Sequence, residues 1–405
     1  VINSGVKGEL EIVIRADNQQ EGQEELIVNF ANNVNSGNYR QQSIIISEEN
    51  IAPIAQVTIS QLDQLVSSVA KDNGETTIEL TIVDANHQDN HIIEWDLPDY
   101  LQAQISANQL KVFIDPTAII LPEDNHNLAS LSVTITDSGT DDLTHTEYIH
   151  FPILEQLAIL DSTDTDLDGI ADNLEGYSDE DGDGLPAFMD NSTIGYIQQL
   201  HINAAQTKVI ETEPGLKLSL GKFARLQFSD GIQLSQQEIE NTGLVPEDTM
   251  SHLSGYFDFE ISQIVPFGNS VLVTIPLSDE LPAFATYRKF SLVGGWRDFV
   301  EDAKNTVSSS ALINGVCPLV DSEHYRTGLN EGDLCIQLLI EDGGPNDADA
   351  IANGRVDDPG VIAVLANEEI AKQVDPEKSS SGGSLNYWFY ILIGLVCLRR
   401  LKLSY

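Results

Sequence analysis

The chain has 405 residues, of which 64 are acidic and 20 are basic, so its formal net charge is −44 at pH 7. This length suits about two to four domains, and an apolar content of 41% allows a sizeable core. Phosphate binding needs lysine and arginine, so the charge argues against a nucleic-acid partner and favours a solvated exterior or a protein that binds cations.

Alternating apolar and polar residues dominate the chain, which is the pattern of half-buried β-strands. Turn-forming residues separate the strands, as in "DNGE" from residue 72 and "PFGN" from residue 266. The sequence therefore predicts a mainly β protein, built from tandem β-sandwich modules.

Residues 1–50 start with "VINSGVKGELEIVI", without methionine or an export signal. We expect the chain to be the C-terminal piece of a longer protein, and the missing signal carries no information about localisation. The stretch "EGQEELIVNF" and the strand after it resemble the latter half of a Calx-beta domain. The resemblance implies a partial β-sandwich, and it transfers no calcium ligand because the first part of that domain is missing.

Residues 51–157 follow the junction "EENIAPIA" and contain "TTIELTIVDANHQDNHIIEWDL" and "LASLSVTITDSGTDD". These strand patterns resemble an Ig-like or PKD-like module. The resemblance implies a second β-sandwich.

Residues 158–195 contain the acidic stretch "DTDLDGIADNLEGYSDEDGDGLPAFMD", which has no lysine or arginine. Like charges at this density repel one another and cost stability. We therefore expect the stretch to need positive charge from outside the protein.

Its first part fits D-x-D-x-D-G-x5-E, the pattern of a calcium loop. Calcium takes six to eight hard oxygen ligands, and Gly169 permits the sharp bend that lets alternating carboxylates converge. The predicted ligands are Asp164, Asp166, Asp168, the carbonyl of Ile170, Asp172 and Glu175.

The pattern recurs fifteen residues later. The predicted ligands of this second loop are Asp179, Asp181, Asp183, the carbonyl of Leu185 and Asp190. Ala187 requires a water at position 9, and Asp190 is shorter than glutamate, so we expect a weaker site. Magnesium fits less well, because it prefers fewer protein ligands and more water. The competing interpretation is a solvated acidic linker.

Only Gly176-Tyr177-Ser178 separates the two loops, which leaves no room for the helices of paired EF-hands. The segments "DTDLDGIADNLE" and "DEDGDGLPAFMD" resemble thrombospondin type 3 repeats. The resemblance implies that metal replaces a hydrophobic core, so the segment should be stiff only with calcium.

Residues 196–366 form a further predicted β region, with a helix expected at its end over 361–374, "VIAVLANEEIAKQV". Cys317 and Cys335 would close a disulfide in an oxidising compartment, and otherwise stay as two thiols. The loop with Asp342, Asp347, Asp349 and Asn353 either binds a cation or caps its own turns.

The segments "IPLSDELPAFATYRKF" and "GGWRDFVEDAKNTVSSSA" resemble the bacterial choice-of-anchor U domain, which precedes C-terminal sorting signals. Cys317 and Cys335 match the two cysteines of that family, so the resemblance implies the disulfide.

A linker over 367–384 leads into the tail over 385–405, which has a short apolar run and a basic end. The run is shorter than the ~20 residues of a full span, but we predict a short transmembrane helix with Arg399 and Arg400 on the cytoplasmic side. The alternative is a buried terminal helix.

The tail resembles a GlyGly-CTERM sorting signal, through Gly382-Gly383, the apolar run and Arg399-Arg400. The resemblance implies that a rhomboid-type protease cleaves near the glycines and that the protein reaches the surface of a Gram-negative cell. Membrane anchoring by the helix would then be transient.

The sequence contains no H-E-x-x-H zinc helix, no G-x-S-x-G elbow and no P-loop. We therefore predict no enzyme, but the C-terminal part of an exported, calcium-binding surface protein with a structural or adhesion role toward an unknown extracellular ligand. The alternative is the accessory region of a secreted hydrolase whose catalytic domain lies upstream.

Overall fold

The computed structural model describes residues 24–30, 40–46, 50, 52–84, 86, 89–122, 127–139, 142–202 and 208–365. The predicted linker and transmembrane helix therefore lie outside the described residues, together with Gly382, Gly383, Arg399 and Arg400. Within the described ranges, no helix combines the length and apolar character needed to cross a membrane.

The first two strands form an antiparallel pair. They are β1 (Glu24–Phe30) and β2 (Arg40–Ile46). Glu24 is paired with Ile46 at one end and Phe30 with Arg40 at the other. The pair lies in the segment that resembles a partial Calx-beta domain.

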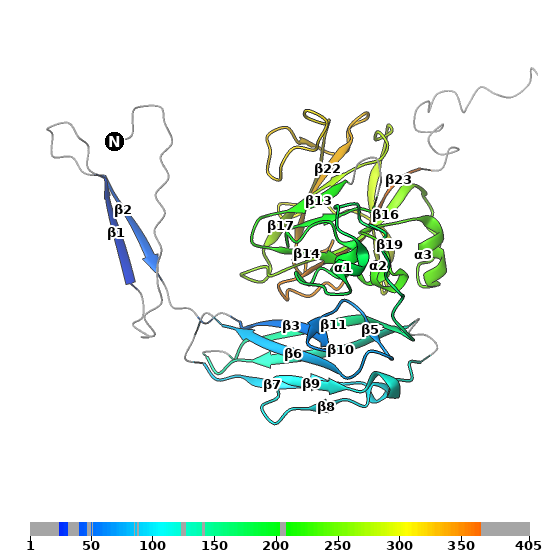
Figure 1. Ribbon diagram of the computed structural model, residues 1–405. Helices are drawn as coiled ribbons and strands as arrows, with labels where there is room; N and C mark the ends of the chain where they lie inside the picture. Colours follow the sequence, from blue (N-terminus) through cyan, green and yellow to red (C-terminus); the bar gives the residue numbers. More distant parts are fainter. Residues whose placement is uncertain are drawn as a thin grey trace, which may run out of the picture.

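Residues 50–157, which we call the middle module, form two sheets (Figure 1). The first sheet has the order β4-β3-β6-β9-β8, with β3 (Ile54–Gln61), β4 (Gln64–Leu65), β6 (Thr76–Val83), β8 (Gln104–Ile105) and β9 (Lys111–Ile114). The second has the order β5-β11-β10-β7, with β5 (Val69–Ala70), β7 (Ile92–Asp96), β10 (Leu128–Thr136) and β11 (Thr144–Leu154). Two 3-10 turns, η1 (Asp99–Leu101) and η2 (Pro116–Ala118), connect strands.

The core of the middle module follows from the alternation in its strands. In β10, every second side chain is buried, including Leu131, Val133 and Ile135. These residues belong to one apolar cluster with Ile78 of β6 and Phe151 of β11. The period-two pattern thus places one face of each sheet inward, as the sequence predicts.

The C-terminal module, residues 196–365, contains two larger sheets. The first has the order β12-β13-β17-β22-β20-β21, with β12 (Ile197–Gln199), β13 (Val209–Thr212), β17 (Ser270–Pro276), β20 (Thr306–Ser310), β21 (Arg326–Thr327) and β22 (Cys335–Glu341). The second has the order β14-β16-β23-β18-β19, with β15 paired to β16; its strands are β14 (Lys217–Leu220), β15 (Gln233–Leu234), β16 (Ser251–Ser262), β18 (Thr286–Ser291), β19 (Gly295–Asp298) and β23 (Val356–Val364).

Two short helices join this module, α2 (Lys222–Gln227) and α3 (Gln236–Thr242). Helix α3 begins with a capping box, in which the Ser235 side chain accepts from the backbone of Glu238 while the Glu238 carboxylate accepts from the backbone N–H of Ser235. Both helices contact β16.

The helix expected over 361–374 is wrong at its start, because Val361–Val364 is the end of strand β23. This strand lies between β16 and β18, and Val361 and Ile362 are both buried. A strand covered on both faces has a continuous apolar run, which periodicity does not distinguish from a helix.

Cys317 and Cys335 form a disulfide with a Cα–Cα distance of 5.6 Å. The bridge links the start of β22 to the loop before β21. Its loop spans 18 residues, and closing a loop of this size stabilises a protein by about 3 kcal/mol.

Candidate metal centre

Residues 158–195, which we call the acidic connector, contact both modules (Figure 1). The backbone N–H of Asp179 donates to the carbonyl of Leu65 in the middle module, at 3.0 Å. On the other side, Leu220 of β14 donates its N–H to the carbonyl of Asp183 at 2.8 Å. The second half of the connector therefore lies within the joint between the modules.

The first predicted loop, Asp164–Glu175 or loop 1, brings its first three aspartates together. Oxygen atoms of Asp164, Asp166 and Asp168 all lie within 4.8 Å of one another. The second oxygen of Asp164 accepts from Gly169 N at 3.1 Å, and Asp168 accepts from Ile170 N at 2.7 Å. These bonds turn the backbone around the carboxylates.

The second predicted loop, Asp179–Asp190 or loop 2, repeats this arrangement. Asp179, Asp181 and Asp183 also have oxygens within 4.8 Å of one another. Asp179 accepts from Gly184 N at 3.2 Å, and Asp183 accepts from Leu185 N at 2.8 Å. Each bond has its counterpart fifteen residues earlier, so the two loops share one register.

The backbone conformations repeat as well. Gly169 has φ +100° and Gly184 has φ +101°, in the region that favours glycine. Two positions earlier, Leu167 has φ 68° and Gly182 has φ 74°. A residue with a Cβ in place of Gly169 or Gly184 would strain the bend, which explains the glycine at the sixth position of both loops.

Both loops end in a single helical turn at the same offset. These turns are α1 (Asp172–Glu175) and η4 (Ala187–Met189). Asp172 N donates to Thr163 O at 2.7 Å, and Ala187 N donates to Ser178 O at 2.6 Å. The ninth residue of each loop is thus bonded to the residue just before its first aspartate.

Several carboxylate oxygens in the loops are buried, and no donor among the described residues reaches them. These atoms are Asp164 Oδ1, Asp166 Oδ2, Glu175 Oε2, Asp179 Oδ1 and Asp181 Oδ2. Buried polar atoms are nearly always paired with protein, water or an ion, and a cluster of carboxylate oxygens without a donor favours a cation among these. Hard oxygens in this number suit a calcium ion, and the residues present therefore fit one in each loop.

The pKa values of these carboxyl groups show the same need for positive charge. Burial, followed by Asp166 and Asp168, raises the pKa of Glu175 to about 7. Burial also raises the pKa of Asp179 to about 6, and that of Asp190 to about 7. The charges of Asp181 and Asp179 also raise the pKa of Asp190, because its carboxyl lies near the loop 2 cluster.

The structure uses some predicted ligands in other ways. Both oxygens of Asp172 accept from Thr165, from its backbone N–H at 2.8 Å and its hydroxyl at 2.7 Å. Asp183 accepts from the side-chain amide of Gln198, and Asp190 accepts from Ser192 N at 3.0 Å. Each oxygen of Asp172 already accepts one hydrogen bond and keeps a further lone pair, so its ligation of an ion stays a prediction.

Loop 2 has protein cations beside it, which sequence reasoning missed. Lys217 and Arg225 of the C-terminal module both lower the pKa of Asp179, against the larger effect of burial. A Cβ at Gly184 would lie 2.6 Å from the Arg225 guanidinium. Part of the charge that offsets the loop 2 carboxylates therefore comes from the C-terminal module itself.

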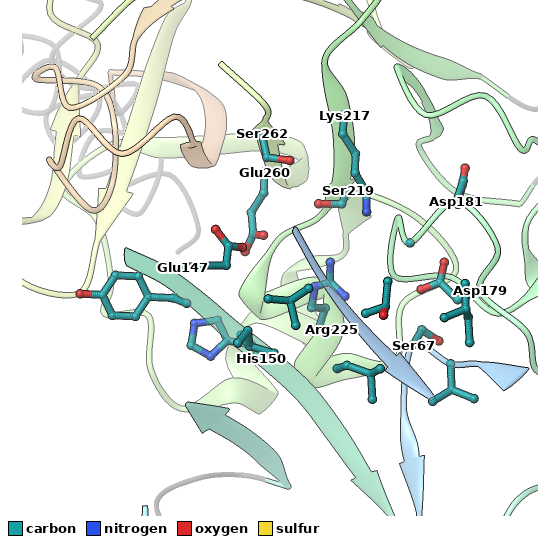
Figure 2. Close-up of a pocket in the computed structure, with 18 of the residues that line it drawn as sticks. Ser67, Glu147, His150, Asp179, Asp181, Lys217, Ser219, Arg225, Glu260 and Ser262 are labelled. Carbon is teal, nitrogen blue, oxygen red and sulfur yellow. The ribbon is translucent and has the colours of Figure 1, made fainter. Parts of the chain in front are cut away.

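A cavity of about 200 Å³ lies where the two modules and loop 2 meet (Figure 2). Glu147 and His150 line it from β11, Asp179 from loop 2, and Arg225 and Glu260 from the C-terminal module. Burial raises the pKa of Glu260 to about 7 and lowers that of His150 to about 3. The joint is therefore a desolvated, mixed-charge contact.

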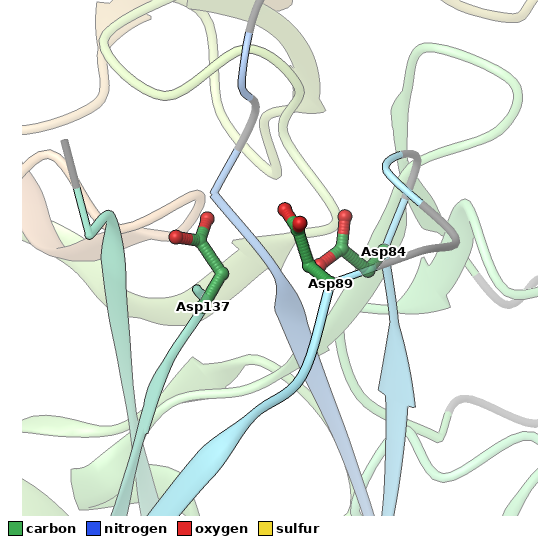
Figure 3. A group of neighbouring side chains, drawn as sticks. All are labelled: Asp84, Asp89 and Asp137. Atoms are coloured by element: carbon green, nitrogen blue, oxygen red, sulfur yellow. The ribbon is translucent and has the colours of Figure 1, made fainter. Parts of the chain in front are cut away.

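A third acidic cluster, also missed from the sequence, lies at one end of the middle module (Figure 3). Asp84 directly follows β6, Asp89 lies shortly before β7, and Asp137 directly follows β10. Asp137 is 2% exposed, and its Oδ2 has no donor among the described residues. Its Oδ1 accepts from Asn50 Nδ2 at 3.2 Å. The cluster offers hard oxygens for a divalent cation close to the start of the module.

The loop after β22 caps its own turns. Asp342 accepts three backbone N–H bonds, including one from Asn353 at 3.0 Å. Asp347 accepts from Gly343 N at 2.8 Å, and Asp349 from Ile351 N at 2.8 Å. These bonds favour the turn-capping interpretation over the cation site.

Together, the fold and the loops define a mainly β, multi-sheet protein with two acidic loops in the connector between two modules. No family model matches the chain, and no curated protein matches it.

Solved structures that match include the protocadherin gammaB7 EC3-6 cis-dimer and the extracellular cadherin domains 3–6 of protocadherin gamma B2. The first is 10% identical, covers 85% of this chain and 83% of that chain, and has a TM-score of 0.19. The second is 10% identical, covers 86% of this chain and 84% of that chain, and has a TM-score of 0.20. TM-scores this low carry no argument about function.

Proposed function

We propose that loop 1 and loop 2 each bind a calcium ion, and that the ions stiffen the joint between the middle and C-terminal modules. The observation that carries this proposal is the set of buried carboxylate oxygens that no donor in the described part of the chain reaches, arranged in two loops of one register. A solvated acidic linker would have its carboxylates in water instead, with ordinary pKa values.

The position of the loops supports a mechanical role. The acidic connector bonds to Leu65 on one side and to Leu220 on the other, and Val66 forms a bridge with Ser178. Because the connector has little apolar core of its own, metal ligation would supply the free energy that orders it. Ordering the connector would then set the angle between the modules.

The experiment is limited proteolysis of the full chain across a calcium titration. We expect calcium to protect residues 158–195 from cleavage, magnesium to protect them much less, and EDTA to reverse the protection. Equal cleavage in calcium and in EDTA would contradict the proposal.

A matched pair of variants tests the ligands directly. Asp166→Asn removes one charge from a side chain that is 1% exposed, and Asp279→Asn removes one charge from an exposed loop. We expect the first to lower the bound-calcium count, measured by equilibrium dialysis, by about one ion per chain, and the second to leave it unchanged. Asp137→Asn shows separately whether the third cluster contributes an ion.

We further propose that the chain belongs to an exported surface protein and has a structural or adhesion role rather than a catalytic one. The strongly acidic composition and the Gly-Gly, apolar and basic parts of the tail support this proposal. Replacing Gly382-Gly383 by Leu-Leu should retain the protein in the cell envelope, measured by fractionation of a Gram-negative host. Unchanged release would argue against the sorting role.

A further inference from the structure

A lysine lies inside the β-sandwich of the C-terminal module. The side chain of Lys289 on β18 is 0% exposed, and so is that of Asp358 on β23. Lysine is almost never fully buried unless it is paired. The two side chains meet at 2.6 Å between Lys289 Nζ and Asp358 Oδ1.

The strand register brings these side chains together on one face. Lys289 is paired with Gly360, two residues beyond Asp358 on β23, and Tyr287 is paired with Ile362. On the other side of β23, Asp358 is paired with Phe259, which is 0% exposed. Directly paired residues share a face of the sheet, so the lysine and the aspartate both project into the apolar interior.

A glycine makes room for the group that touches this pair. A Cβ at Gly360 would overlap the hydroxyl of Tyr287. The Tyr287 hydroxyl instead donates to Asp358 Oδ1 at 3.1 Å. The carboxyl of Asp358 is thus contacted by an amine and a phenol, both from β18.

As an ion pair, this arrangement is poorly satisfied. The contact of Lys289 Nζ with Asp358 lacks hydrogen-bond geometry, and Asp358 Oδ2 has no donor among the described residues. A buried ion pair offsets its desolvation only when further hydrogen bonds satisfy the remaining protons and lone pairs. An uncharged group in place of the two buried charges would remove most of this desolvation cost.

We propose that Lys289 and Asp358 are joined by an intramolecular amide bond between Nζ and Cγ, a cross-link from β18 to β23. The lone pair of Nζ attacks Cγ, so the Nζ–Cγ bond forms. The bond from Cγ to the carboxyl hydroxyl breaks, and that hydroxyl leaves with a proton from the nitrogen as water. Nothing is oxidised or reduced, and no co-reactant is consumed.

The surroundings favour the reactive protonation states. Burial lowers the pKa of the Lys289 amine, against the pull of Asp358, and burial raises the pKa of the Asp358 carboxyl. A desolvated, neutral lysine is a nucleophile, and a protonated carboxyl can release water. Tyr287 is a positioning residue, whose O–H polarises the oxygen on which negative charge develops.

The test is mass spectrometry of the purified full chain after reduction of the disulfide. We expect an intact mass one water molecule below the sequence mass, and a branched tryptic product that joins the Lys289 peptide to the Asp358 peptide. An intact mass equal to the sequence mass, with the two peptides recovered separately, overturns the proposal.

Variants separate the cross-link from other mass changes. Lys289→Met should restore the mass expected from its sequence, whereas Asp358→Asn should still form the same amide, by losing ammonia in place of water. Tyr287→Phe keeps the ring but should slow formation, seen as a larger uncross-linked fraction early after synthesis. Peptide mapping of the wild-type chain decides the question even if a variant fails to fold.

Discussion

Aspartates in the acidic connector have different roles, although the sequence shows them as one residue type. Asp172 has both oxygens bonded to Thr165, so it closes loop 1 from within. Asp166 is also buried, but its Oδ2 has no donor among the described residues. The difference is that both oxygens of Asp172 have a donor, whereas one oxygen of Asp166 keeps all of its lone pairs for an ion.

Calcium should reverse the pH dependence of stability. Burial raises the pKa of Glu175 to about 7 and that of Asp179 to about 6. A raised pKa means that the folded state holds these protons more tightly than the unfolded chain. Without calcium, their stabilising contribution is therefore fully present below the unfolded pKa of roughly 4 and is lost as pH rises through the folded values.

With calcium, the same carboxyl groups must ionise to bind the ion, so stability should rise over this pH range. Thermal unfolding at a series of pH values, in EDTA and in calcium, measures both slopes. Two parallel curves would show that these groups do not bind the metal.

At the scale of elements, the connector consists of two copies of one loop. The bonds that place Gly169 and Gly184, and the turns α1 and η4, recur at one offset. This local repetition explains why the sequence pattern was informative: ligand spacing and the glycine bend are both set within about twelve residues.

A substitution in the bend should weaken loop 1 through the backbone alone. Gly169 has φ +100°, and a Cβ there would meet nothing within 4 Å. Gly169→Ala should therefore cost about 1–2 kcal/mol, the penalty for a left-handed conformation, and lower calcium affinity by about tenfold for each 1.4 kcal/mol.

Gly195→Ala is the matched control, since Gly195 also has open space around it but no positive φ. Calorimetric titration of both variants with calcium compares their losses of calcium affinity. Equal losses would mean that the bend does not set the affinity.

Much of the strand content and the register of both loops was predictable from the sequence, because period-two alternation and ligand spacing are local. The contacts between distant segments were not. Lys217 and Arg225 reach loop 2 only through packing of the C-terminal module, and Asp137 joins Asp84 only where two strands end together. The helix expected from Val361 onward is wrong for the same reason, since the two strands that flank β23 come from elsewhere in the chain.

At the scale of the whole molecule, the modules are joined by more than the connector. Arg355 is 6% exposed and donates to the carbonyl of Tyr148 in the middle module at 3.2 Å. The guanidinium also lies 2.9 Å from Asp357 and 4.0 Å from Glu147. The two modules are therefore joined by a hydrogen bond between residues 207 positions apart, with the Glu147 carboxylate beside it.

Removing this contact should loosen the joint. Arg355→Met would remove the bond to Tyr148 and leave Asp357 without its arginine, at a cost of about 3–5 kcal/mol for breaking a buried pair. Lys111→Met is the control, because Lys111 and Glu79 form an exposed pair that is worth about 0–1 kcal/mol.

We expect scanning calorimetry of the full chain to show a large loss of unfolding free energy for Arg355→Met and not for Lys111→Met. Arg355→Met should also speed proteolysis of the acidic connector. Similar losses for both variants would show that the contact does not secure the joint.

Strand β23 has a consequence for how the protein would respond to force. It is the last described strand before the tail, and β16 and β18 flank it on both sides. A pull transmitted from the C-terminal residues would enter the fold through this strand. Since two hydrogen-bonded ladders must yield together before β23 can be extracted, tension would be shared across the sheet, and the C-terminal module would resist unfolding from this end.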